Sequence, residues 1–101
     1  MDATQVSDDM FGRACRLPLM LWVLDHPKGR VYQSEPPESL GARTALRQEL
    51  DRMARAGLLR EERPDGDPRV YYAKTDSPLW DIVQTARDVL KRTTTSQPVP
   101  D

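Results

Sequence analysis

Apolar residues recur at regular spacing in several short segments of the chain, and the clearest pattern lies near its centre. Over residues 42–56 (ARTALRQELDRMARA), Leu46, Leu50 and Met53 recur at the three- and four-residue spacing of one helix face. Gly57 follows where a left-handed C-terminal cap belongs. The spacing therefore predicts an amphipathic helix over about residues 42–56.

Two further segments have helical apolar patterns. In residues 9–26 the pattern is interrupted by Pro18, so the segment is either a helix kinked there or a short leader followed by a helix that begins near Pro18. A last helix is predicted over about residues 78–92, with Ser77 as its cap. Its apolar residues form a wide stripe: Leu79, Ile82, Val83, Ala86, Val89 and Leu90.

Strand-like segments lie on both sides of the central helix. Residues 30–33 (RVYQ) predict a short strand, whereas residues 34–41 (SEPPESLG) have room for one helical turn, since adjacent prolines disfavour a full helix. Residues 58–74 contain two strand-like runs, LLREER and RVYYAK, on either side of PDGDP. This arrangement predicts a β-hairpin with its tip at Asp65-Gly66.

These elements predict one mainly α domain with a small β-hairpin, over residues 11–92. An N-terminal extension, residues 1–10, precedes it. Residues 93–101 (TTTSQPVPD) have no apolar periodicity and are expected to form a flexible C-terminal tail. Hydrophobic residues make up 38% of the chain, which is enough for a compact core.

No segment has the pattern of a membrane or secreted protein. The longest uncharged apolar run, residues 17–24, is far shorter than the roughly 20 residues that a membrane span needs. The first ten residues are acidic and do not resemble a signal peptide. A single cysteine, Cys15, fits a reducing compartment. We therefore expect a soluble, cytoplasmic protein.

Groups suited to catalysis or metal binding are sparse. One cysteine and one histidine, Cys15 and His26, cannot complete a tetrahedral zinc site within one chain. There is no glycine-rich phosphate loop and no serine nucleophile beside a histidine. We interpret Cys15 as a packed thiol and His26 as a cation at a helix C-terminus. The sequence thus predicts no enzyme, no cofactor and no metal.

The distribution of charge is more informative than the net charge of −1. Residues 42–57 contain four arginines against Glu49 and Asp51, so a locally basic surface is compatible with a nearly neutral protein. The alternative is a solvated helix face on which Glu49 and Asp51 pair with arginines three or four residues away.

The order of elements resembles that of winged helix-turn-helix regulators of the ArsR-like and MarR-like type. The residues that carry the resemblance are ALRQELDRMARAGLL (45–59), VYY (70–72) and DSPLWDIV (76–83), within a match over about residues 17–92. The resemblance implies a bacterial, nucleoid-associated transcriptional regulator that binds double-stranded DNA. Residues 42–56 would then be the recognition helix in the major groove, and residues 58–74 the wing.

The resemblance also implies which residues contact DNA. Arginine can pair with guanine and glutamine with adenine, which suits the exposed start of the recognition helix. The residues expected to read bases there are Arg43, Thr44, Arg47 and Gln48. Those expected to meet the DNA backbone are Arg52 and Arg55 on the helix and Arg60, Arg63 and Arg69 in the wing. The wing also contains four acids, Glu61, Glu62, Asp65 and Asp67.

A homodimer is expected, because the apolar stripe of the last helix is wider than a small core requires. The residues expected at the contact are Trp80, Val83, Val89 and Leu90. The alternative function is a protein-interaction module of the same fold without DNA binding, which docks a partner through the acidic wing or the proline-rich segment before the central helix. The sequence leaves open whether there is an effector.

Overall fold

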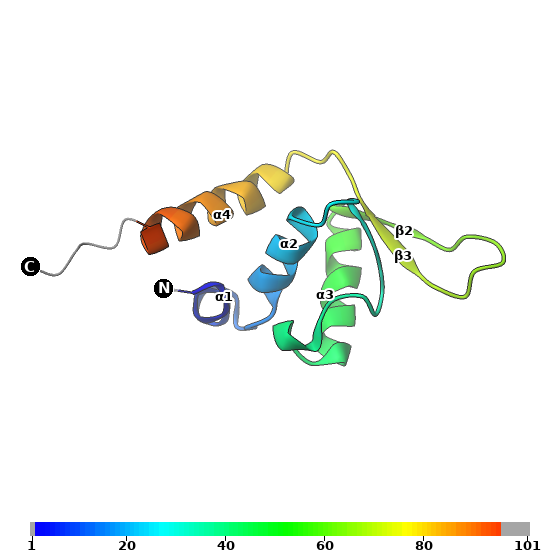
Figure 1. Ribbon diagram of the computed structural model, residues 1–101, viewed down its shortest axis with the longest axis horizontal. Helices are drawn as coiled ribbons and strands as arrows, with labels where there is room; N and C mark the ends of the chain where they lie inside the picture. Colours follow the sequence, from blue (N-terminus) through cyan, green and yellow to red (C-terminus); the bar gives the residue numbers. More distant parts are fainter. Residues whose placement is uncertain (1, 96–101) are drawn as a thin grey trace, which may run out of the picture.

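The computed structural model describes residues 2–95, and within them the chain forms four α-helices, a short 3-10 helix and three β-strands (Figure 1). The strands make one antiparallel sheet in the order β1-β3-β2, so the fold is α+β. In chain order the elements are α1 (Ala3–Phe11), α2 (Arg16–Leu24), β1 (Arg30–Tyr32), η1 (Glu38–Leu40), α3 (Arg43–Arg55), β2 (Leu59–Glu62), β3 (Tyr71–Lys74) and α4 (Trp80–Thr95). Of the tail expected over residues 93–101, residues 93–95 instead continue helix α4, and residues 96–101 lie outside the described residues.

The N-terminal part contains two helices where the apolar pattern predicted one interrupted segment. Asp2 caps α1, since its carboxylate accepts a hydrogen bond of 2.8 Å from the N–H of Gln5. Gly12 ends the helix with a φ of 71°. Helix α2 begins just before Pro18, which lies in its first turn, where a missing N–H costs little. Of the two alternatives, the structure shows a leader followed by a helix.

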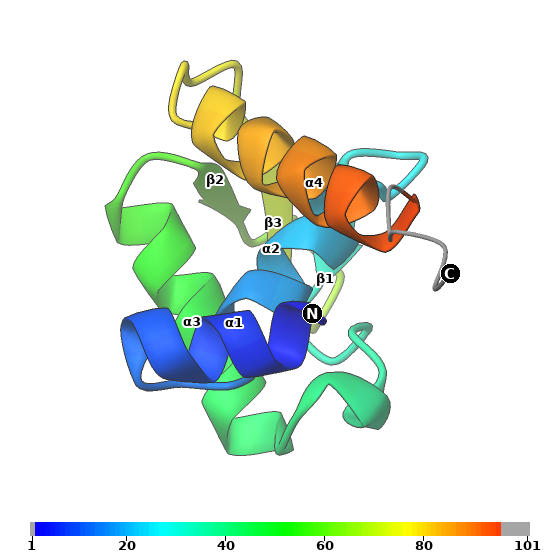
Figure 2. The same ribbon diagram turned by 90° about the vertical axis from the view of Figure 1, so that its left-hand side faces the viewer.

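Residues 1–10, expected as an N-terminal extension outside the domain, instead form most of helix α1, which is packed against α2. Ser7 is fully buried. Its hydroxyl donates to the carbonyl of Arg13 at 2.5 Å and accepts from the N–H of Leu17 at 2.9 Å. Figure 2 shows α1 and α4 on the same side of the molecule, with α2 behind them. Helix α1 is therefore part of the folded body.

The core lies where α2 and α3 meet the inner face of the sheet. Helix α3 confirms the predicted central helix, and its apolar residues Leu46, Leu50 and Met53 are buried as expected. Each such side chain contributes about 1.5–3 kcal/mol to folding when fully buried. The other fully buried apolar side chains are Leu19, Val23, Val31 and Tyr72.

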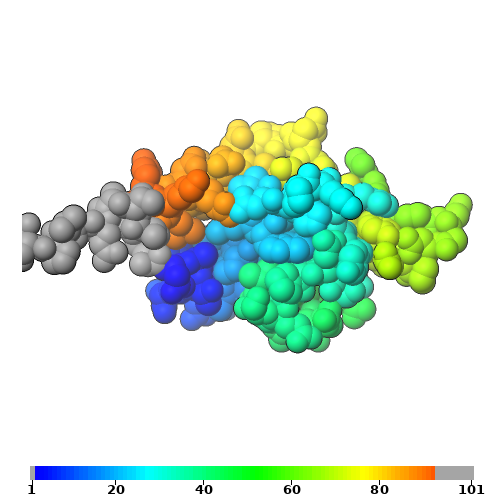
Figure 3. Space-filling model, viewed as in Figure 1, coloured from blue at the N-terminus to red at the C-terminus, as the bar shows by residue number. Residues whose placement is uncertain are grey.

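The predicted hairpin is formed by β2 and β3, with Glu62 opposite Tyr71 at the end next to the turn. Its turn is closed where the N–H of Asp67 donates to the carbonyl of Pro64 at 3.3 Å, and Gly66 has a φ of 79°. The tip therefore lies at Asp65 and Gly66, as predicted. Strand β1 pairs with the other edge of β3. The hairpin projects from the body, in yellow-green in Figure 3.

Helix α4 begins slightly later than predicted. The Ser77 hydroxyl does accept a hydrogen bond of 3.1 Å from the N–H of Leu79, but residues 78–79 form a turn and the helix starts at Trp80. The indole N–H of Trp80 donates to the carbonyl of Leu58 at 2.9 Å, which fixes the start of α4 to the start of the hairpin. Within residues 2–95, no helix is both long enough and apolar enough to cross a membrane.

Candidate nucleic-acid interface

One side of α3 is exposed and rich in arginine. Its opposite side packs into the core, so the helix is held rigidly while the other side faces solvent. The exposed residues include all six that were predicted on this helix: Arg43, Thr44, Arg47, Gln48, Arg52 and Arg55. The structure therefore places these residues together on one surface.

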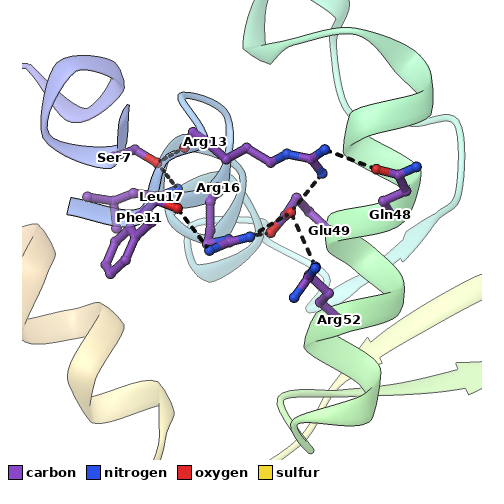
Figure 4. Close-up of polar contacts among 8 residues, drawn as sticks. All are labelled: Ser7, Phe11, Arg13, Arg16, Leu17, Gln48, Glu49 and Arg52. Carbon is purple, nitrogen blue, oxygen red and sulfur yellow. Dashed lines mark hydrogen bonds and ion pairs between the residues drawn. The ribbon is translucent and has the colours of Figure 1, made fainter. Parts of the chain in front are cut away.

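The two acids of α3 do not lie on this exposed surface. Glu49 is only 1% exposed and points toward the connection between α1 and α2 (Figure 4). Asp51 is half-buried, and its carboxylate accepts a hydrogen bond of 2.8 Å from the hydroxyl of Tyr72. The exposed residues of α3 therefore contain four arginines and no acid.

The pairing of Glu49 bears out the sequence-based alternative only in part, through an ion pair with Arg52 at 3.8 Å. Instead of pairing mainly within the helix, Glu49 accepts hydrogen bonds from Arg16 Nε at 2.7 Å, Arg16 Nη2 at 3.2 Å and Arg13 Nη1 at 3.0 Å. The one neighbour on its own helix, Arg52, lies 3.8 Å away. Glu49 thus ties α3 to α2 and leaves Arg52 largely exposed.

The arginines also determine the ionisation of Glu49. Burial acts to raise the pKa of this carboxyl group, because a charge is poorly solvated away from water. The hydrogen bonds and positive charges of Arg16 and Arg13 outweigh burial, so the pKa of Glu49 lies below its ordinary value. Glu49 is therefore ionised and compensated at neutral pH.

Arg43 and Arg47 lie at the start of the exposed surface. Arg43 donates to the carbonyl of Ser34 and to Glu38, both at 3.1 Å. Because Arg43 and Glu38 are more than half exposed, their ion pair is weak and can open when a ligand competes. Arg47, one turn later, lines a hollow of about 200 Å³ together with Thr44, Arg43 and Ser34.

Gln48 has a partner that changes its expected role. Its side-chain oxygen accepts a hydrogen bond of 3.0 Å from Arg13 Nη2 (Figure 4). A bidentate pair with adenine requires both the oxygen and the nitrogen of the amide. With one lone pair of its oxygen engaged, Gln48 still has its amide N–H groups to donate, which suits an acceptor such as a phosphate oxygen. Arg13, which was not predicted, adds a cation next to this surface.

The arginines of the hairpin are paired with its acids. Arg63 lies 3.1 Å from Glu61, and Glu62 accepts from Arg30 at 2.9 Å and from Arg60 at 3.1 Å. Hydrogen bonds from Arg30 and Arg60 lower the pKa of Glu62.

The last predicted arginine of the hairpin, Arg69, contacts aromatic rings. Its guanidinium lies 5.1 Å from the centre of the Tyr32 ring, and it donates to the Tyr71 hydroxyl at 3.4 Å. Tyr71 in turn donates to Asp67 at 2.8 Å. Arg63 and Arg69 both have partners, Arg63 in Glu61 of the hairpin and Arg69 in the two tyrosine side chains.

Two of the residues predicted at a dimer contact are placed elsewhere. Trp80 and Val83 are only 7% and 4% exposed, because they pack into the core of their own chain. Leu90 is half-buried against the same core. Of the four predicted residues, Val89 alone belongs among the exposed apolar residues of α4. Trp80 and Val83 therefore offer little surface to a partner, and their place at a dimer contact stays a prediction.

Cys15 and His26 both contact neighbouring parts of their own chain. Cys15 is buried beside Gly41. His26 Nε2 lies 2.6 Å from Glu35, and its Nδ1 accepts from the N–H of Lys28 at 3.2 Å. Among residues 2–95, no three histidine, cysteine, aspartate or glutamate side chains gather as they would around a metal ion.

The buried Glu49 was missed at the sequence level, although the pattern contains a signal for it. Glu49 and the three apolar residues Leu46, Leu50 and Met53 follow the i, i+3, i+4, i+7 spacing of one buried helix face. A carboxylate at such a position needs cationic partners from another segment, which Arg13 and Arg16 supply. Comparisons of the chain with protein-family models, curated proteins and solved structures found no match.

Proposed function

We propose that this protein is a winged helix-turn-helix transcriptional regulator that binds double-stranded DNA in a sequence-specific way. Helix α3 would act as the recognition helix in the major groove, and the β2–β3 hairpin would be the wing. The observation that carries the proposal is the exposed surface of α3, with four arginines and no acid. A helix about 20 Å long fits into a groove about 12 Å wide.

The burial of Glu49 supports this proposal physically. A carboxylate on the exposed surface would repel phosphates and would occupy an arginine. Because Arg13 and Arg16 neutralise Glu49 inside the protein, its contact with Arg52 is the longest of its ion pairs, and Arg52 stays largely exposed. The nearly neutral net charge then restricts DNA binding to this surface.

The positions of the exposed residues suggest different roles in DNA binding along α3. Arg47 lies near the start of the helix beside the neutral Thr44, and is the best placed residue to pair with guanine O6 and N7. Arg52 and Arg55 lie later on the exposed surface and would meet phosphates. If about three phosphates are neutralised, log K should fall with log salt with a slope of about −3.

The wing would contribute less to DNA binding than a hairpin with unpaired basic residues would. Arg60 and Arg63 are paired with Glu62 and Glu61, so their contact with phosphates would require these ion pairs to open. We therefore assign most of the binding free energy to α3.

Selection from random duplexes, followed by fluorescence anisotropy, tests the proposal. We expect a preferred site, and Arg47→Ala should weaken binding to it by about 1–3 kcal/mol, or roughly 5- to 150-fold. Arg47→Lys is the matched control. Lysine keeps the charge but lacks the planar fork, so it should restore non-specific binding and not the base preference. Absence of duplex binding at about 50 mM salt would instead favour the protein-interaction module.

A further inference from the structure

The outer face of the sheet, on the side away from the core, brings two tyrosine rings and two guanidinium groups together. Tyr32 of β1 and Tyr71 of β3 are partners in register, and their ring centres lie 6.4 Å apart. The Arg30 guanidinium lies 3.9 Å from the centre of the Tyr71 ring, and that of Arg69 lies 5.1 Å from the centre of the Tyr32 ring. Both rings are half-buried and both arginines are exposed. These are the groups on which a planar molecule can stack.

The same four side chains line a hollow of about 510 Å³. Its volume lies within the roughly 300–1,000 Å³ of small-molecule sites. The turn after α2 and the loop after β1 complete it, through His26, Lys28 and Glu35. No residue of α3 lines this hollow, so it is separate from the candidate nucleic-acid interface.

The lining of the hollow has an excess of positive charge. Lys28, Arg30 and Arg69 contribute cations, whereas Glu35 contributes the one carboxylate. Both oxygens of Glu35 already have partners: Oε2 lies 2.6 Å from His26 Nε2, and Oε1 accepts from the N–H of Tyr32 at 3.2 Å. Because the whole chain has a net charge of −1, the positive charge here is local and favours an anion.

Each of the three cations keeps donors for a ligand. Among residues 2–95, no acceptor pairs with the ammonium group of Lys28. Arg30 donates to Glu62 through Nε at 2.9 Å, which leaves its two terminal nitrogens. Arg69 donates to the Tyr71 hydroxyl through Nη1 at 3.4 Å. A guanidinium that stacks on a ring through its face can still bind an anion through the N–H groups at its edge.

We propose that this hollow binds a nucleoside monophosphate. The two parts of such a ligand match the two kinds of lining group: the planar base would stack beside the tyrosine rings and guanidinium faces, and the phosphate would accept hydrogen bonds from the cations. A nucleoside lacks the charge and inorganic phosphate lacks the ring, so each would use only half of the site. The same chemical unit occurs as a free nucleotide and at the 5′ end of a single strand.

An NMR titration of the ¹⁵N-labelled full chain with AMP tests the proposal. We expect saturable shifts over residues 28–32 and 69–71, with a Kd between about 10 μM and 1 mM. Adenosine and inorganic phosphate should each bind at least about tenfold more weakly than AMP. A 5′-phosphorylated strand of four adenosines distinguishes the two sources: binding tighter than that of AMP identifies a strand end, and weaker binding identifies the free nucleotide.

Substitutions test the two parts of the site separately. Lys28→Gln should weaken AMP binding by about threefold to tenfold, and Tyr32→Leu by about tenfold. Tyr32→Phe keeps the ring and should bind AMP as the wild type does. Lys91→Gln is the control for charge, because it removes a positive charge from the exposed end of α4, outside the hollow, and should leave binding unchanged. Lys28 is exposed, so this test holds even where Tyr32→Leu fails to fold.

Three results would overturn the proposal. Absence of saturable shifts up to about 10 mM AMP would overturn the site. Inorganic phosphate that binds as tightly as AMP would overturn the nucleotide as its ligand. Shifts centred on α3, or AMP binding that Lys28→Gln leaves unchanged, would overturn this location. All these measurements are made without duplex DNA, so a failure here and a failure of the proposed function can be told apart.

Discussion

Replacing Arg16 by methionine tests whether the buried ion pair of Glu49 joins α2 to α3. Arg16 donates two hydrogen bonds to Glu49, at 2.7 and 3.2 Å. Methionine preserves much of the apolar stem but leaves the carboxylate with Arg13 and the more distant Arg52. Breaking a buried ion pair costs about 3–5 kcal/mol, and the remaining Arg13 argues for the lower end, about 3 kcal/mol. At about 4–8 °C per kcal/mol, the Tm should fall by about 12–24 °C.

The pH dependence of this loss identifies its cause. In the wild type the pKa of Glu49 is lowered, so its stabilisation is fully present above the ordinary titration range of glutamate and is lost as the pH falls from that range through the lowered pKa. In Arg16→Met, fewer positive charges oppose the effect of burial, so the pKa of Glu49 should be higher than in the wild type. Protonation of Glu49 at low pH should then remove the cost of a buried charge that has lost its partner. The stability difference should therefore narrow between about pH 7 and pH 4.

Urea unfolding of wild type and variant at both pH values measures this difference. Arg13→Met serves as the comparison, because Arg13 donates one hydrogen bond to Glu49 and its loss should cost less. A loss below about 1 kcal/mol for Arg16→Met, or a loss that does not change with pH, would refute the reasoning.

Three further predictions concern other parts of the molecule. Gly41→Ala should destabilise the fold by about 1–3 kcal/mol in urea unfolding, because a Cβ at this position would lie 2.8 Å from Cys15 Cβ. Tyr72→Phe should cost about 0.5–1.5 kcal/mol through loss of the hydrogen bond to Asp51. Burial raises the pKa of Tyr72 to about 12, so wild-type stability should fall as pH rises above the ordinary tyrosine range, and the fall should be smaller in Tyr72→Phe. Arg55→Ala should weaken all duplexes alike in anisotropy titrations and reduce the salt slope by about one.

The central helix and hairpin could be predicted because their signals are local. Apolar residues at helical spacing followed by Gly57 define α3, and the stretch around Gly66 defines the turn. Helix α1 was missed because its signal is weaker. Most of its residues are exposed, and it is stabilised by the cap at Asp2 and by the burial of Ser7 against α2. A buried serine is indistinguishable in sequence from a surface serine.

The candidate site could be predicted where its residues lie on the side of α3 opposite the buried apolar residues, as Arg43 and Arg47 do. It was not predictable where it depends on distant segments. The partners of Glu49 are Arg13 and Arg16, more than thirty residues earlier in the chain.

The apolar residues of α4 posed a similar problem. They form two rows offset by a single residue, so the pattern alone does not reveal which row faces α2. Packing decides this: Trp80 and Val83 face the core, whereas Ile82 is exposed.

The most direct test of the central claim is an amide NMR titration of the ¹⁵N-labelled protein with a selected duplex. A chain of 11.5 kDa is well suited to residue-by-residue mapping. We predict that the largest changes in chemical shift occur at the start and exposed surface of α3, at Arg43, Thr44, Arg47 and Gln48, with smaller changes in the hairpin. Shifts confined to α4 or to the outer face of the sheet, or no shifts at about 50 mM salt, would contradict the assignment of α3 as the DNA-binding helix.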